Sequence, residues 1–160
     1  QYSDIIFGDQ NEWEIASGVP HIPFEALDEN YVIDREAYLS YFRKMHRLFP
    51  KCKKMVMAVR NQIASSHHTL SGLLYDTVED QLYTTRIYDI QPIVDPMGVG
   101  DAFIAAYIHA HQKWGDENQY CLDFSLSASA IKNTIPGDQN LVSEEEIISN
   151  MTSSGGRIQR

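Results

Sequence analysis

Short apolar, β-favouring runs alternate with helical patterns along the chain, and this alternation constrains the fold more than any other feature. The run at residues 4–7 passes directly into a helical pattern at 9–18, and the run at 53–59 follows a helical pattern at 35–49. A strong helical pattern also covers 102–114. Strands that alternate with helices predict an α/β fold with a largely parallel sheet.

Side-chain spacing predicts which helix faces are buried. In 35–49, which Asp34 caps, residues three and four apart share one face, namely Tyr38, Tyr41, Phe42 and Met45. In 102–114 the same spacing predicts an inward face made of Phe103, Ile104, Tyr107 and Ile108. Ser143 and Glu146 form a capping box that predicts a short final helix.

The composition indicates one domain with an acidic surface. The 160 residues are 43% hydrophobic, which is enough to bury a core at the size of a single domain. Thirteen Lys and Arg against twenty-two Asp and Glu give a formal charge of −9, which disfavours nonspecific binding to nucleic acid or to an anionic membrane. A phosphate group would therefore be bound locally, by backbone N–H groups at a helix N-terminus.

The cysteine positions and the lack of a long apolar segment predict a cytoplasmic protein. Cys52 and Cys121 lie far apart and belong to no C-x-x-C pair, which argues against a disulfide framework and a structural zinc site. No apolar run has the length of a membrane span, and residues 1–8 lack a signal-peptide pattern. We expect residues 1–150 to form one folded unit and residues 151–160 to be a flexible tail. Because an apolar strand begins almost at once, we also expect preceding structure to be missing from this chain.

The motif with the clearest chemical meaning consists of Gly98, Val99, Gly100 and Asp101. Glycines let the backbone approach a ligand closely, so that successive N–H groups can surround an anion. The motif opens the helical pattern at 102–114, and the helix dipole adds partial positive charge there. The four residues predict a cradle for a phosphoryl group with a carboxylate beside it.

Asp101 has two interpretations. An acidic residue in the first turn of a helix can simply cap the helix, and for an arbitrary Gly-x-Gly-Asp sequence this is the more frequent role. Phosphoryl transfer to an alcohol, by contrast, needs a carboxylate that accepts the hydroxyl proton within reach of a phosphate site. Because both parts are adjacent here, Asp101 is a candidate general base.

Residues 95–103, Asp-Pro-Met-Gly-Val-Gly-Asp-Ala-Phe, resemble the C-terminal signature of the ribokinase-like (PfkB) carbohydrate kinases. That signature is Asp-Thr-x-Gly-Ala-Gly-Asp followed by a small residue and Phe. The resemblance implies that Asp101 is the catalytic base, and that the anion hole is supplied by Gly98, Val99 and Gly100.

The loop before the glycines departs in part from this signature. Pro96 and Met97 replace the usual small polar residues, whereas Asp95 is retained. In the family this loop lies beside a monovalent-cation site. The resemblance therefore implies a cation-binding role for Asp95, with K⁺ as the candidate ion.

Two further segments resemble the 2-keto-3-deoxygluconate kinase branch of this family. Residues 131–147 match its Leu-Lys-His-Thr-Ile-Pro-Gly-Asp-Phe-Asn segment, and residues 59–76 match its Thr-Leu-Arg segment. The resemblance implies nucleotide-binding roles, beside those of the glycines, for Arg60, Asn61, Lys132 and Asn133. Position alone, on a predicted helix over 118–133, would make Lys132 a lysine that faces solvent.

The family also carries Asn-x-x-Glu just after a strand, where it organises Mg²⁺ and its waters. Two registers exist in this chain, Asp9 with Glu12 or Asn11 with Glu14, and alignment of Gly18 favours the first. An Asp in the Asn position still offers an oxygen to Mg²⁺ or to its water. The alternative is that these acidic residues only form the first turn of a helix, where the dipole favours them.

The resemblance implies a three-layer α/β/α sandwich, of which this chain is the C-terminal, nucleotide-binding portion. It implies an ATP- and Mg²⁺-dependent kinase for the primary hydroxyl of a small sugar acid, 2-keto-3-deoxygluconate, with the 6-phosphate as product. It also implies a homo-oligomer at full length and an inactive isolated chain. Two alternatives stay open: a non-catalytic regulatory or interaction module, and a kinase of the same fold for another sugar or a nucleoside.

Overall fold

A computed structural model of the chain describes residues 2–22 and 32–153. Its centre is a five-stranded sheet in the order β1-β2-β3-β4, with the short strand β5 also paired to β3. The strands are β1 (Ile5–Gly8), β2 (Lys54–Ala64), β3 (His67–Asp76), β4 (Gln81–Thr84) and β5 (Tyr88–Ile90). Because β2 occupies one edge of β3, β4 and β5 share its other edge, at opposite ends of the strand.

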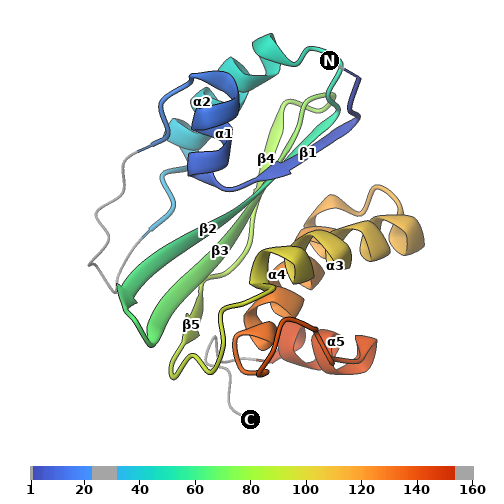
Figure 1. Cartoon of the computed structure of the whole chain (residues 1–160). Coiled ribbons are helices and arrows are strands. Elements are labelled where there is room, and N and C mark those ends of the chain that lie inside the picture. Colours follow the sequence, from blue (N-terminus) through green and yellow to red (C-terminus); the bar gives the residue numbers. More distant parts are fainter. Residues whose placement is uncertain (1, 23–31, 154–160) are drawn as a thin grey trace.

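Helices cover both faces of this sheet (Figure 1). Two of them pack on one face and three on the other. The first group is α1 (Gln10–Ser17) and α2 (Arg35–Leu48), and the second is α3 (Val99–Trp114), α4 (Asn118–Lys132) and α5 (Glu144–Thr152). The predicted α/β/α sandwich is confirmed. In the described part of the chain, no helix is both long enough and apolar enough to cross a membrane.

The strand pairing is mixed rather than mainly parallel, which corrects the prediction for the described residues. β1 and β2 are parallel, whereas β2–β3, β3–β4 and β3–β5 are antiparallel. The reason lies in the connections. A turn of two residues, Ser65 and Ser66, joins β2 to β3 and can only reverse the chain direction, whereas the segment with α1 and α2 is long enough for a parallel crossover.

Alternating side chains of β2 and β3 contribute to two separate cores. Val56 and Leu74 pack with α3, α4 and α5, whereas Met55 and Leu73 pack with α1 and α2. The predicted inner face of α2 is confirmed, since no more than 4% of the surface is exposed for Tyr38, Tyr41, Phe42 and Met45. The sheet thus separates an α1–α2 core from an α3–α5 core.

The inner face of α3 differs in part from the prediction. Phe103 and Tyr107 are buried as expected, but Ile108 is 46% exposed. The other buried positions are small: Ala102, Ala106 and Ala110. Because the separation of packed helices depends on the side chains at their contact, these alanines let α3 lie close to α4.

The predicted boundary between folded unit and tail at residue 150 stays a prediction. Helix α5 continues past that residue to Thr152. Residues 154–160 lie outside the described residues.

Candidate functional site

Gly98 ends the connection after β5 and is the N-cap of α3. Its φ of 73° lies in the left-handed region that favours glycine. A Cβ at this position would lie 2.2 Å from the carbonyl oxygen of Asp138, so the loop around Asp138 packs directly on the Gly98 backbone. Gly100 differs, because a Cβ there would meet open space. Of the two glycines in the motif, only Gly98 is required by the fold itself.

The first turn of α3 presents free backbone donors. The Ala102 N–H donates to the Gly98 carbonyl oxygen at 2.9 Å, the first hydrogen bond of the helix. The N–H groups of Val99, Gly100 and Asp101 precede it and have no acceptor within the helix. Among residues 2–22 and 32–153, no side chain caps this end. The three donors and the helix dipole together supply what the predicted anion hole requires.

Asp101 is the third residue of α3 and its side chain is exposed. It does not cap the helix, because Gly98 holds that position and no side chain makes a capping hydrogen bond. The interpretation of Asp101 as a simple cap is therefore wrong. Across the described residues, no hydrogen bond or ion pair engages its carboxylate. A ligand hydroxyl at this helix end would find both carboxylate oxygens available.

Asp95 holds the loop before Gly98 against the loop that follows α4. Its Oδ1 accepts the Met97 N–H at 3.0 Å, and its Oδ2 accepts the Gly137 N–H at 2.8 Å. The N–H groups of Val94 and Asp95 in turn donate to the Asn133 carbonyl oxygen at 2.8 and 3.2 Å. The hydrogen bonds from Met97 and then Gly137 are the main reasons why the pKa of Asp95 lies below its ordinary value. Asp95 acts here as a structural brace between two loops.

Lys132 and Asn133, at the C-terminal end of α4, are both buried. The expectation that Lys132 faces solvent is wrong, because its side chain is 0% exposed and its Nζ donates to the Ile135 carbonyl oxygen at 3.0 Å. The Asn133 amide donates back to the Ser129 carbonyl oxygen at 3.0 Å. The loop that follows α4 thus supplies the acceptor for the Lys132 ammonium. Both side chains are engaged within the protein.

Arg60 and Asn61 are neighbours on β2 and point to opposite faces of the sheet. Arg60 follows Val56 in the two-residue alternation, so it lies on the face of α3 and is exposed. Asn61 lies on the face of α1 and α2 and is 1% exposed. The structure therefore brings Arg60, but not Asn61, to the side of the sheet that carries the anion hole.

Asp9 and Glu12 meet at the start of α1, directly after β1. The Asp9 Oδ1 accepts the Glu12 N–H, and the Glu12 Oε2 accepts the Asp9 N–H, both at 2.8 Å. Glu14, from the alternative register, is instead hydrogen-bonded to the N–H and the ring of His21. Each carboxylate of the Asp9–Glu12 pair keeps one oxygen outside this capping box. These two oxygens suit Mg²⁺, which commonly keeps several water ligands and is bound through one or two carboxylates together with the phosphates of a substrate.

This acidic pair does not by itself form a metal centre. Within residues 2–22 and 32–153, no three His, Cys, Asp or Glu side chains converge as a ligand set for a metal ion. Nor does any hydrogen bond or ion pair in that part of the chain join Asp9 or Glu12 to residues 98–101. Mg²⁺ at this place would therefore depend on the phosphates of a bound substrate.

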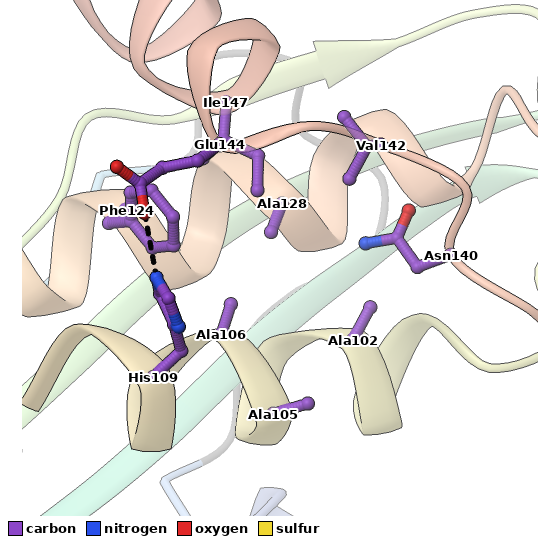
Figure 2. Close-up of a pocket in the computed structure, with 10 residues that line it drawn as sticks. All are labelled: Ala102, Ala105, Ala106, His109, Phe124, Ala128, Asn140, Val142, Glu144 and Ile147. Carbon is purple, nitrogen blue, oxygen red and sulfur yellow. Dashed lines mark hydrogen bonds and ion pairs between the residues drawn. The ribbon is translucent and has the colours of Figure 1, made fainter. Parts of the chain in front are cut away.

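A pocket of about 290 Å³ opens beside the first half of α3 (Figure 2). It begins one residue after Asp101 and lies between α3, α4, α5 and the connection that leads into α5. Its lining residues are Ala102, Ala105, Ala106, His109, Phe124, Ala128, Asn140, Val142, Glu144 and Ile147. Most of this surface is apolar, so the pocket suits a flat organic group.

Polar side chains lie at two places in the pocket. The Asn140 amide projects into it from the loop, and the Oδ1 of Asn140 is buried with no hydrogen-bond partner in the described residues (Figure 2). At the other place the His109 Nε2 lies 2.8 Å from the Glu144 Oε2, and the His109 ring stacks on Phe124 with centroids 5.9 Å apart. Lys113 and then His109 hold the pKa of Glu144 below its ordinary value. A ligand would thus meet an apolar surface and one unpaired amide.

Solved structures of carbohydrate kinases resemble this chain in fold. The 2-dehydro-3-deoxygluconokinase of Thermotoga maritima has a TM-score of 0.78 and 27% identity, over 94% of this chain and 41% of that chain. A PfkB family carbohydrate kinase from Listeria grayi has a TM-score of 0.73 and 25% identity with the same coverage. The chain has the ribokinase-like (PfkB) fold. The ribokinase of Arabidopsis thaliana, complexed with ribose and ATP, has a TM-score of 0.61 and 18% identity, over 94% of this chain and 41% of that chain.

The predicted resemblance to ribokinase-like kinases, including the 2-keto-3-deoxygluconate (2-dehydro-3-deoxygluconate) kinase branch, is confirmed by these neighbours. Scans against protein-family models and against curated proteins give no match. The chain spans about 41% of the length of the solved chains named above. It therefore corresponds to one part of the ribokinase-like fold.

The pocket beside α3 was not predicted from the sequence. One signal was present, because Ala102, Ala105 and Ala106 are small residues spaced along one face of a helix that was otherwise predicted to be apolar. The other walls come from α4, α5 and the loop before α5. No pattern in the sequence states that these segments meet.

Proposed function

We propose that the chain is the nucleotide-binding part of an ATP-dependent sugar kinase. The observation that carries this proposal is the first turn of α3. Three backbone N–H groups without helical acceptors, on Val99, Gly100 and Asp101, lie beside a carboxylate that no group of the described residues engages. A phosphoryl group in transfer needs both parts, donors for its equatorial oxygens and an acceptor for the proton of the attacking hydroxyl.

In this proposal the pocket beside α3 binds the purine of ATP. A volume of about 290 Å³ is at the lower limit for ligand pockets, so it suits a base rather than a whole nucleotide. The Asn140 amide can pair with the edge of the base, whose face would lie on Ala105 and Ala106 toward His109. His109 follows Asp101 by eight positions along α3, about 12 Å at the α-helical rise, so a base at this end of the pocket leaves room for the ribose and the phosphates.

The proposed chemistry assigns one task to each group at the helix N-terminus. The N–H groups of residues 99–101 bind the transferring phosphoryl oxygens. Asp101 accepts the proton of the attacking hydroxyl, whose oxygen forms the new bond to phosphorus as the bond to ADP breaks. Arg60 contributes positive charge from the same side of the sheet. Mg²⁺, held through Asp9 and Glu12 together with the phosphates, would supply neutralising charge.

For the acceptor we propose 2-keto-3-deoxygluconate, phosphorylated at its primary hydroxyl. The support is the likeness to the 2-dehydro-3-deoxygluconokinase of Thermotoga maritima. Because the chain spans 41% of that protein, we propose that turnover requires further residues that contact the sugar, and that the isolated chain binds ATP without phosphorylating an acceptor.

The test compares full-length protein with its Asp101→Asn form in ATP-dependent phosphorylation of 2-keto-3-deoxygluconate. We expect the rate to fall by on the order of 10²–10⁴-fold with ATP affinity retained, because only proton acceptance is removed. Glu36→Gln, an exposed carboxylate on the α1–α2 side, is the matched control and should leave the rate unchanged. If the unmodified protein binds ATP but phosphorylates neither this acid nor a panel of sugars and nucleosides, the catalytic proposal fails in favour of a regulatory module.

A further inference from the structure

Lys132, the last residue of α4, has a side chain that is fully buried. Its Nζ donates to the Ile135 carbonyl oxygen at 3.0 Å, and this is the one hydrogen bond of the ammonium within the part of the chain that the structure describes. Removal of an ammonium from water has a large free-energy cost unless nearby negative charge offsets it. A buried lysine with a single carbonyl partner therefore needs a counter-charge close by.

The carboxylate of Asp95 supplies this counter-charge. The pKa of Asp95 is lowered by the Met97 N–H first, by the Gly137 N–H second, and further by the positive charge of Lys132. The hydrogen bonds place the two groups on joined segments: the Asp95 N–H donates to the carbonyl oxygen of Asn133, the residue after Lys132, and the Asp95 Oδ2 accepts from Gly137, two residues after the Ile135 that accepts from the ammonium. Their charges offset each other where the 94–98 and 133–138 loops meet.

These two loops together position the start of α3. Val94 and Asp95 donate to the Asn133 carbonyl oxygen, and Gly137 donates to the Asp95 carboxylate. The Gly98 backbone then lies against the Asp138 carbonyl. The charge of Lys132 therefore lies at the contacts that position the backbone N–H groups of residues 99–101.

The ribokinase-like resemblance implies a monovalent cation beside this loop, and the residues present do not fit one. Alkali cations in proteins are bound by carbonyl and carboxylate oxygens that replace their water. Here the Ile135 carbonyl accepts from the ammonium, and both oxygens of Asp95 accept backbone N–H groups. A second positive charge next to Lys132 would also be repelled. On these grounds we do not expect K⁺ to bind through Asp95.

We propose that the ammonium of Lys132 is a built-in replacement for an exchangeable monovalent cation, so that ATP binding and phosphoryl transfer proceed without added K⁺. The inference rests on the proposed function, because it concerns the same phosphate site. Lys132 is a positioning residue in this scheme. It acts through Asp95 and the 133–138 loop, and it contacts neither ATP nor the acceptor.

The first experiment measures the initial rate of the full-length kinase in KCl, NH₄Cl and choline chloride at equal ionic strength. The unmodified protein should give the same KM for ATP and the same kcat in all three salts. Lys132→Met, which keeps a linear apolar stem and removes the ammonium, should raise the KM for ATP by about tenfold in choline chloride, equal to 1.4 kcal/mol. K⁺ or NH₄⁺ should restore most of that loss, because each can occupy the space of the ammonium.

A matched control comes from the second buried lysine. Lys54 is 6% exposed, and its Nζ contacts Asp116 at 2.5 Å and Asn118 at 2.7 Å, at the start of α4 and away from the 94–98 and 133–138 loops. Lys54→Met should lower thermal stability, and its KM for ATP should not depend on which cation is present. Selective rescue of Lys132→Met would separate a positioning role from the general cost of losing a buried charge.

A readout without catalysis separates failure of this inference from failure of the proposed function. The melting temperature of the 160-residue chain should be the same in KCl and choline chloride, whereas that of Lys132→Met should rise in KCl. If no acceptor is phosphorylated and these shifts still occur, the inference stands and the kinase proposal falls. A saturable K⁺ activation or stabilisation of the unmodified protein would overturn the inference, as would a folded Lys132→Met form that K⁺ does not rescue. If Lys132→Met does not fold in any salt, Lys132→Gln is used in its place. The response of the unmodified protein to K⁺ then tests the inference without any variant.

Discussion

The backbone of Gly98 lies so close to Asp138 that a Cβ at position 98 would come within 2.2 Å of the Asp138 carbonyl oxygen. This contact joins the loop before α3 to the loop after α4. The proposed phosphate site therefore depends on segments that are 40 residues apart in the chain, since 138 minus 98 is 40. Substitutions at the two glycines of the motif should have opposite effects on stability.

Gly98→Ala should destabilise the protein, and Gly100→Ala should not. Alanine at 98 would need a left-handed backbone, at about 1–2 kcal/mol, and would also meet the Asp138 carbonyl. Alanine at 100 meets open space inside a helix, so the free energy of unfolding should rise by about 0.5–1 kcal/mol. Urea unfolding monitored by circular dichroism measures both changes.

Gly100→Ala should nevertheless weaken ATP binding, because its methyl group points to the space that the proposed phosphates occupy. Isothermal titration calorimetry with a non-hydrolysable ATP analogue checks this. An unchanged affinity in the stabilised Gly100→Ala form would show that no phosphate approaches this part of α3.

Asp9→Ser should separate helix capping from metal binding at the start of α1. Serine caps a helix about as well as aspartate, so the unfolding free energy should change by no more than about 0.5 kcal/mol. The Mg²⁺ concentration for half-maximal activity should rise, because the carboxylate is lost. Ser143→Ala, at the capping box of α5, is the control: it should cost about 1 kcal/mol of stability and leave the Mg²⁺ requirement as it was. An unaltered Mg²⁺ requirement in Asp9→Ser would show that Asp9 caps α1 and does not contribute to Mg²⁺ binding.

Ala105→Phe should block the pocket beside α3. Ala105 lines the pocket and is exposed, so a phenyl ring can enter the space without disturbing the core. We expect the Kd for ATP to rise at least tenfold, about 1.4 kcal/mol, with the melting temperature unchanged. Ile108→Phe, on the outer side of the same helix, should bind ATP normally. Equal affinity in the two variants would place the purine elsewhere.

Asp80→Asn should lower stability at neutral pH and have less effect in acid. The Asp80 carboxylate accepts from the Nε of Arg43 at 2.9 Å, from its Nη2 at 2.5 Å and from the Tyr75 hydroxyl at 2.6 Å. Arg43 first and Tyr75 second lower the pKa of Asp80 to about 2. Because the folded-state pKa lies below the ordinary 3.8, this stabilisation is fully present above pH 3.8 and is lost as the pH falls toward about 2.

Urea midpoints of the two proteins at pH 7 and pH 3 measure this effect. Asn tolerates the positive φ of 53° at position 80, so the substitution removes the charge without adding backbone strain. The gap between the midpoints should be larger at pH 7 than at pH 3. A gap that does not change with pH would mean that the Arg43–Asp80 pair adds no net stability.

Much of the fold could be predicted because its signals are short-range. Asp34 and Ser143 cap helices as predicted, since a side-chain oxygen needs only an N–H three residues further on. The inner face of α2 follows from helical spacing in the same way. Strand direction was harder to predict, because it depends on the length of each connection and on which strands pair. The sheet is mixed, whereas a mainly parallel one was predicted.

The features of the site can likewise be divided into those that short-range sequence patterns predict and those that they do not. The sequence by itself determined that residues 98–101 open a helix with two glycines and a carboxylate, because these properties belong to adjacent residues. Only the tertiary structure decided that Asn61 faces away from that helix end, that Lys132 is buried with its ammonium on the Ile135 carbonyl, and that alanines of α3 border a pocket. The physical reason is that burial and electrostatic environment depend on which distant segments pack against a side chain, and no local pattern encodes them.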